Sequence, residues 1–364
     1  MSLKRAALTG SLLGLFLIIP LHGQDTRSGN GGPGLDLTIG GTGVAIGHIP
    51  RVNGLRINFR DRHLQEVNGL NLTLWSPRGD VGGTVRGLAM GPAAPAADRL
   101  QGISLGGLAV VGEDEISGIG LGGLAVVSAG DTRGLMMGGL ATVTEGTALG
   151  VSLGGLAAVT DGGSSGLSIG GLAVVAGGEV DGHGPGKPGI TGSGTLQGIQ
   201  MGGLAVVGNQ GIRGISAGGL AVVAGGGDLT GLNVGGLAVV AGEGVARGIN
   251  LGGLAVVGTE GIQGLSLAGL AVAGDGYIEG FSAAGYKIQA QEARWFTVAA
   301  WKVEVEEFTG LSVGGWNDHH HFSRGVSIGV FNRTENLQGV QIGLLNYAGN
   351  NARFPWLPIL NAHF

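Results

Sequence analysis

The residues best suited to chemistry stand in one short run, "NDHHH", Asn317 to His321, which holds three consecutive histidines. Imidazole nitrogens bind Zn²⁺ and related metals, and histidine is the commonest general acid or base near neutral pH. Successive side chains of a strand point to opposite faces, so adjacent histidines do not converge on one ion. The run also lacks the ligand spacing of defined metal sites. We therefore predict an exposed polar turn after Trp316 that binds no metal.

Two further patterns are typical of binding loops but fit the chain poorly. "GIGLGG", Gly118 to Gly123, matches the glycine spacing of dinucleotide-binding loops, but it belongs to a repeat and no helical pattern follows it. "GEDEIS" carries Glu113, Asp114 and Glu115, but the equivalent segments "TDGGSS" and "GNQGIR" lack those carboxylates. No carboxylate pair and no Ser, His and Asp set recurs in the repeat. We expect no catalytic residue, no metal ligand and no cofactor, and hence a protein that is not an enzyme.

The composition excludes other classes of protein. The 364 residues include 82 glycines, 43% are hydrophobic, 12% are charged, and none is cysteine. The glycines have no three-residue period, which excludes collagen, and the apolar content is too high for a disordered glycine-rich tail. Without cysteine there are no disulfides and no thiolate chemistry. A net charge of −5 gives no basic patch for nucleic acid.

The chain repeats one glycine-bracketed apolar phrase. "GISLGGLAVVGEDEIS", residues 102–117, is followed at once by "GIGLGGLAVVSAGDTR", and most opening glycines are 16 residues apart. A sustained fixed period indicates an array in which each unit packs mainly on its neighbours. "WFTVAAWKVEV" keeps the apolar pattern with Trp295 in the opening position, so we interpret it as a disguised unit. The opening glycines are Gly54, Gly69, Gly87, Gly102, Gly118, Gly134, Gly150, Gly166, Gly198, Gly214, Gly231, Gly248, Gly264, Gly280, Gly310, Gly325 and Gly339.

The spacing inside a unit predicts the fold. Apolar residues step by three, from Ile116 to Ile119 and from Leu121 to Leu124, and each step passes through glycine. An odd step in a strand needs a bend or bulge if both ends face one core, and glycine accepts such bends. We predict an all-β protein, a repeat β-solenoid with ~16-residue coils, in which these four residues face the core.

Each part of a coil has an expected role. "GISL" and "LAVV" are predicted to be short strands, with Gly106 and Gly107 as the corner and "GEDEIS" as the polar return. Which of Val126 and Val127 faces inward is left open by the sequence. The alternative is an outer-membrane antiparallel β-barrel, since one phrase is long enough for a tilted membrane strand and the chain ends in Phe364. The odd steps and the lack of a polar face favour the solenoid.

The ends of the chain differ from the repeats. Lys4 and Arg5 precede an apolar stretch that ends before Gly23, as in a signal peptide. We expect Phe354, Trp356 and Phe364 to cover the exposed C-terminal end of the stack. The expected organisation is a signal peptide over 1–23, a glycine-rich tether over 24–50, a repeat β domain over 51–350 with an extruded loop near 176–197, and a C-terminal aromatic cap over 351–364.

The closing units "GLSVGGWN", "GVSIGVFN" and "GVQIGLLN", together with "VNGLRINF" near the start, resemble the bacterial surface repeat-containing proteins. Those exported families are built from G-x-Q-x-G-L-x-N units. The likeness covers roughly the last 55 residues closely, whereas the central GGLAVV block is a simpler variant without the Gln and Asn. The resemblance implies a cell-surface, envelope or outer-membrane location as the partner environment. It carries over no activity and no site residue.

A polar residue recurs at the second position after each opening glycine, between two apolar neighbours. Alternation would place these side chains outside, as a solvated face or as a ladder that binds a regular ligand such as a polysaccharide. The candidate ladder residues are Ser104, Ser152, Ser168, Gln200, Ser216, Asn233, Asn250 and Ser266.

The sequence favours a non-enzymatic exported surface or envelope protein with a structural or adhesive role. An outer-membrane pore or anchor is the alternative, and a glycan-binding or glycan-processing β-helix is the third candidate.

Overall fold

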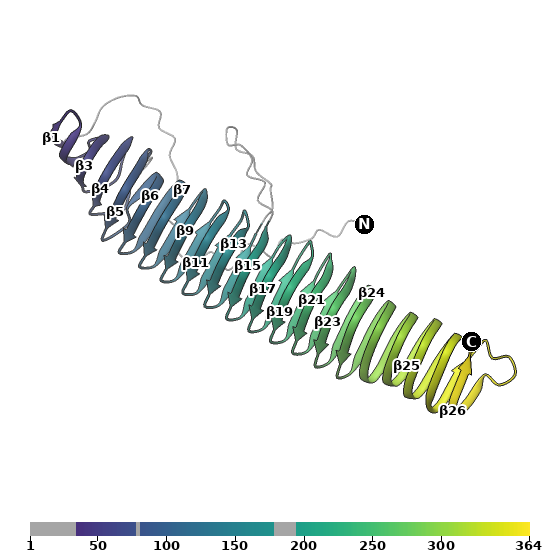
Figure 1. Ribbon diagram of the computed structural model, residues 1–364. Coiled ribbons are helices and arrows are strands. Elements are labelled where there is room, and N and C mark those ends of the chain that lie inside the picture. Colours follow the sequence, from purple (N-terminus) through teal and green to yellow (C-terminus); the bar gives the residue numbers. More distant parts are fainter. Residues whose placement is uncertain (1–33, 78–80, 178–193) are drawn as a thin grey trace, which may run out of the picture.

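The computed structural model describes residues 34–77, 81–177 and 194–364. In these residues every regular element is a β-strand, and the chain winds into a long rod from β1 at one end to β26 at the other (Figure 1). Among them there is no helix that could span a membrane. The predicted signal peptide, and most of the predicted loop near 176–197, lie outside the described residues.

Over residues 125–268 each coil contributes one longer and one shorter strand, which stack into two parallel sheets, whereas the first coils contribute only the longer strand. The longer strands are β3 (Arg51–Asn58), β4 (Glu66–Thr73), β5 (Thr84–Gly91), β9 (Asp131–Gly138), β11 (Ala148–Gly154), β13 (Ser164–Gly170), β15 (Thr195–Gly202), β17 (Gly211–Gly218), β19 (Leu229–Gly235), β21 (Val245–Gly252) and β23 (Gly261–Ala268). The shorter strands are β8 (Ala125–Ser128), β10 (Ala141–Thr144), β12 (Ala157–Thr160), β14 (Ala173–Ala176), β16 (Ala205–Gly208), β18 (Ala221–Ala224), β20 (Ala238–Ala241) and β22 (Ala255–Gly258).

Some coils keep an extended backbone through the return, so one strand takes part in both sheets. These are β6 (Ala96–Gly106), β7 (Ala109–Gly122), β24 (Ala271–Ala284) and the long β25 (Lys287–Ala348), which winds through several coils. The ends are β1 (Gly34–Ile39), β2 (Thr42–Gly47) and β26 (Trp356–His363).

Successive coils pair in parallel and in register. Gly150 pairs with Gly134 of the coil before and with Gly166 of the coil after, a step of 16 residues each way. Identical positions therefore stack about 4.8 Å apart along the rod. The pairing of β13 with β15 and of β14 with β16 carries the stack past residues 178–193. The predicted β-solenoid is confirmed, and the antiparallel alternative is wrong for these coils.

Glycine is required at the bends because the coils approach so closely there. Gly150 has a φ of +115°, and a Cβ on it would overlap the carbonyl oxygen of Gly134 in the coil before. At the Gly-Gly corner, a Cβ on Gly154 would overlap the carbonyl oxygen of Ala157. Neither contact can be relieved by moving a side chain, since both involve backbone atoms.

The orientation of the side chains differs from the prediction. Ile116 and Val126 are buried, but Ile119 and Leu124 are 37% and 38% exposed, and Leu121 is only half-buried. Each bend turns three consecutive residues outward, so inward positions on its two sides are four residues apart rather than three. The prediction that Ile119, Leu121 and Leu124 face the core is therefore wrong.

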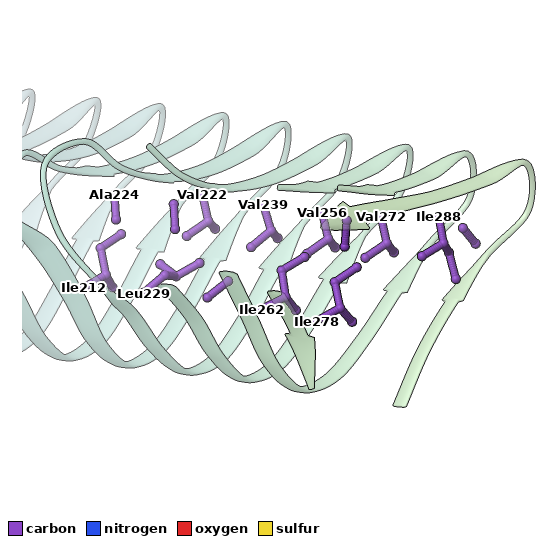
Figure 2. Close-up of a cluster of buried hydrophobic side chains, with 14 of the residues drawn as sticks. Ile212, Val222, Ala224, Leu229, Val239, Val256, Ile262, Val272, Ile278 and Ile288 are labelled. Carbon is purple, nitrogen blue, oxygen red and sulfur yellow. The ribbon is translucent and has the colours of Figure 1, made fainter. Parts of the chain in front are cut away.

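The bends leave a narrow core of small and β-branched side chains. Val126 faces inward and Val127 lies half-buried on the outside, which answers the question that the sequence left open. Figure 2 shows the inward valines of successive coils in line, from Val222 to Val272, opposite isoleucines such as Ile262. Each such side chain contributes about 1.5–3 kcal/mol when its neighbours are in place.

Both ends of the stack are closed by a reversed strand. Residues 34–47, which we expected to be a tether, form a hairpin in which β1 pairs antiparallel with β2, and β2 pairs in parallel with β3. At the other end β26 pairs antiparallel with the last part of β25. The aromatic residues do not cover that end, because Phe354, Trp356 and Phe364 remain exposed, Phe364 at 93%. The last coil pairs instead with the backbone of β26, which is the outermost strand at that end.

Gly150→Ala is expected to lower the free energy of unfolding by about 3 kcal/mol, because the new methyl group meets backbone in a left-handed conformation. Gly226→Ala is the matched control, since the nearest atom to its Cβ is the Asn209 carbonyl oxygen at 3.3 Å. Urea unfolding followed by circular dichroism measures both. Equal midpoints for the two variants would contradict the role given to the opening glycine.

Candidate functional site

The predicted ladder residues lie inside the solenoid. Seven of the eight are at most 4% exposed, and Ser152 is half-buried. The prediction of an outward ladder is wrong because the bend at each opening glycine reverses the alternation. The second position after that glycine consequently points into the core, between the two sheets. The ladder residues concerned are Ser104, Ser152, Ser168, Gln200, Ser216, Asn233, Asn250 and Ser266.

The buried ladder connects neighbouring coils by hydrogen bonds. The Ser216 Oγ donates to Asn233 Oδ1 at 2.6 Å, and Asn233 Nδ2 donates to Asn250 Oδ1 at 2.9 Å. In-register amides of this kind satisfy one another along a stack, as in cross-β assemblies. These side chains therefore stabilise the core and present no surface to a ligand.

A second buried ladder, which the sequence analysis missed, runs through the closing units. Asn317 Nδ2 donates to Asn332 Oδ1, and Asn332 Nδ2 donates to Asn346 Oδ1, each at 2.7 Å. Asn346 Nδ2 then donates to the Leu357 carbonyl oxygen of β26 at 3.2 Å. The recurring asparagine at the end of "GLSVGGWN", "GVSIGVFN" and "GVQIGLLN" was the available signal.

A buried ion pair near the N-terminal end was also missed. Arg56 Nη1 lies 2.9 Å from Asp61 Oδ1, and neither side chain is exposed. Asn71 Oδ1 also accepts from Arg56, and Thr73 Oγ1 donates to Asp61 Oδ2 at 2.7 Å. Burial lowers the pKa of Arg56, and the Asp61 carboxylate opposes that shift. Arg56 occupies the same inward position as the ladder, so this network belongs to the core.

The three histidines are divided between core and surface. Asn317, Asp318 and His319 are buried, so the predicted exposed turn is wrong for those residues. The His319 ring stacks on Phe308 with centroids 4.6 Å apart, and its Nδ1 lies 2.9 Å from Ser323 Oγ. Burial, and then the neighbouring His320, lower the pKa of His319 to about 3. Its neutral ring is a core side chain.

Outside the core, charged side chains gather around Glu304. Its carboxylate is 2.7 Å from Lys287 Nζ and 3.3 Å from Lys302 Nζ, and Lys302 also lies 3.1 Å from Asp318 Oδ2. The hydrogen bond from Lys287 is the main reason that the pKa of Glu304 falls to about 2. His320 Nε2 is 3.5 Å from Glu304 Oε1.

Carboxylate and imidazole ligand atoms of Glu304, Asp318 and His320 lie within 4.8 Å of one another. The Lys302 ammonium already lies beside both carboxylates and supplies the positive charge that a metal ion would bring. The arrangement is therefore an ion-pair network on the surface of the rod.

The most extensive surface feature is a row of large apolar side chains at the Gly-Gly corners, which we name the apolar ridge. Each member directly follows the corner pair, which is Gly-Gly in most coils, Ala-Gly before Leu270 and Tyr286, and Ala-Ala before Trp301; the exposed members are 36–56% exposed. The exposed ridge residues are Leu108, Leu124, Leu156, Leu172, Leu204, Leu220, Leu237, Leu254, Leu270, Tyr286, Trp301 and Trp316.

Beside the ridge, the corner glycines form the floor of an apolar groove. One stretch, of about 1000 Å³, is lined by Leu105, Leu121 and Met137 with the glycines that follow them. A second stretch, of about 850 Å³, is lined by Leu251, Leu267 and equivalent residues toward the C-terminal end. Neither lining includes a charged side chain.

No protein-family model, curated protein or solved structure matches the chain. The resemblance to the bacterial surface repeat-containing proteins stays a prediction.

Acidification is expected to destabilise the protein through His319. Its folded pKa of about 3 lies below its ordinary value of 6.5, so below pH 6.5 the unfolded chain binds a proton that the folded chain does not. Relative to His319→Gln, the wild type should lose about 1.4 kcal/mol of unfolding free energy per pH unit between those values. Urea titrations at roughly pH 7, 6, 5 and 4 measure the difference.

His321→Gln, at an exposed position, is the control and should follow the wild type at every pH. A His319→Gln variant that keeps the wild-type pH dependence would mean that His319 titrates normally in the folded protein.

Asn332→Ala is expected to cost about 2–3 kcal/mol, because it leaves buried amide groups of Asn317 and Asn346 without their partner. Asn336→Ala changes an exposed asparagine in the same coil and should cost less than about 0.5 kcal/mol. Thermal unfolding compares the two variants. A similar small shift for both would show that the amide ladder does not stabilise the C-terminal coils.

Proposed function

We propose that the protein is a non-enzymatic, exported rod of a bacterial surface or envelope, with a structural or adhesive role. The observation that carries the proposal is that the recurring polar residues of the repeat are buried in the core. Nearly all of the recurring serines and asparagines lie in the core, where Ser216, Asn233 and Asn250 bond to one another. The repeat thus builds length and rigidity rather than a converging set of reactive groups.

The construction of the rod supports a structural role. The coils stack in parallel from β3 to β25, and at each end the parallel stack stops at a strand, β1 or β26, that runs antiparallel to its neighbour. Such a molecule has a fixed length set by the number of coils in its sequence. A spacer or a surface projection needs a defined length.

Export and surface location rest on the sequence. The signal-like segment 1–23 supports export, and the resemblance of the closing units supports the surface or envelope. Glycan binding, the third candidate, depended on an outward polar ladder. Because that ladder is buried, it gives no support to a glycan-binding face.

Location can be tested by cysteine labelling, because the natural chain has no cysteine. Glu145→Cys places a thiol on an exposed return, and Ser216→Cys places one in the core. A membrane-impermeant maleimide applied to intact cells should label the first variant and leave the second unlabelled until the protein is denatured. Labelling of Glu145→Cys only after complete cell lysis would place the protein inside the cell and refute the proposal.

A further inference from the structure

The apolar ridge continues with a change of residue type along the rod. Nine exposed ridge positions hold leucine, and the row then continues as Tyr286, Trp301 and Trp316. Tryptophan and tyrosine have an apolar ring with one polar atom, and they concentrate where hydrocarbon meets head groups in membranes. The two lysines of the described coils, Lys287 and Lys302, directly follow Tyr286 and Trp301.

Along the leucine part of the ridge, charged side chains lie on other parts of the coil. The described returns and the positions just before the opening glycines carry charges such as Asp114, Glu115 and Arg133, which pair with one another across coils. The groove lining and the exposed ridge hold none. The return and the Gly-Gly corner lie at opposite ends of the shorter strand. The rod is therefore amphipathic along its length, with a charged edge and an apolar edge.

The backbone at the apolar edge has no free donor for a peptide. At one typical corner the Gly155 N–H donates to the Gly138 carbonyl at 3.1 Å, and the Leu156 N–H donates to the Leu140 carbonyl at 2.7 Å. A peptide in the groove would bury its own N–H and C=O groups without partners, which is costly. A hydrocarbon chain has no such groups to satisfy.

The repetition also disfavours a second copy as the occupant. Ridge residues Leu204, Leu220, Leu237 and Leu254 are identical and stack at one spacing, so a copy displaced by one coil would make the same contacts. Such a face specifies no register, whereas stable dimers have one defined arrangement. A lipid surface needs no register.

We propose that the apolar ridge and its groove seat the rod lengthwise on a lipid bilayer surface. The leucines enter the outer acyl region, and Tyr286, Trp301 and Trp316 lie at the level of the head groups. Lys302, whose Nζ is 4.4 Å from the Trp316 ring, keeps its ammonium paired with Glu304 and Asp318 beside these aromatic residues. This inference rests on the proposed function, because it gives the exported rod a membrane to lie on.

The test is flotation of the purified full chain with vesicles of phosphatidylethanolamine and phosphatidylglycerol. The ridge variant combines Leu220→Glu, Leu237→Glu and Leu254→Glu. The control combines Gln197→Glu, Asn209→Glu and Gln263→Glu, which add the same charge at exposed positions away from the ridge.

Wild type and control should float, and the ridge variant should bind vesicles at least tenfold less. Binding should also persist at high salt, since it depends on apolar contact. Circular dichroism checks that the ridge variant is folded. Should it fail to fold, quenching of wild-type tryptophan fluorescence by brominated lipid, reduced in Trp301→Phe with Trp316→Phe, tests the same surface.

Wild type that does not float refutes lipid seating, and dimers that the ridge variant abolishes would identify a second copy as the occupant. Equal flotation of the ridge variant and the control also refutes lipid seating through the ridge. Cysteine labelling separates the two proposals. A chain that is labelled on cells but does not float refutes the lipid surface alone, and one that floats but is intracellular refutes the location alone.

Discussion

The close approach of glycine on glycine at the opening bend is the contact on which the other features of the rod depend. Because a Cβ on Gly150 would overlap the Gly134 carbonyl, the close stacking of coils favours glycine over glycine, and this favours one register for the strands. One coil has a tryptophan, Trp295, in place of the opening glycine. Trp295 adopts a φ of +90° in that position, a conformation that bulky residues rarely occupy. Its neighbour in the next coil is again a glycine, Gly310, as the contact requires.

A bend this tight leaves little interior space, and the core consists of what fits there. Many coils turn one isoleucine or leucine and one valine inward, and the other inward positions hold small or polar residues such as glycine, alanine, serine, threonine or asparagine. For some of the polar side chains the stack supplies a hydrogen-bond partner at the equivalent position of the next coil. Asn233 donates to Asn250 in the next coil, so the amide is satisfied along the axis rather than by water. The same logic gives the C-terminal coils their asparagine ladder, which ends on β26.

The period, the all-β class and the Gly-Gly corners could be predicted from the sequence, because these follow from spacing and from the backbone needs of glycine. Which side chains point into the core and which point outward could not be predicted. The three-residue step from Ile116 to Ile119 was interpreted as two inward residues about a bend, whereas the bend turns Ile119 outward. Since strand alternation has a period of two, one error of phase placed the whole polar ladder on the wrong face. The end strands β1 and β26 were missed because their sequences do not belong to the repeat.

Because Ile119 and Leu124 point outward, the recurrence of apolar residues at these positions needs an explanation other than packing in the core. If Ile119 and Leu124 were core residues, their recurrence would need no further reason, but the core is already filled by Ile116 and Val126. Stacking on identical neighbours half-buries each outer leucine and explains a preference for apolar side chains in the sheets. It does not explain why the corner, where a side chain extends beyond both sheets, is leucine or an aromatic residue in coil after coil. A turn in contact with water only is usually polar. The proposed lipid surface supplies the apolar environment that such a ridge favours, and the returns, with their charged residues, favour water.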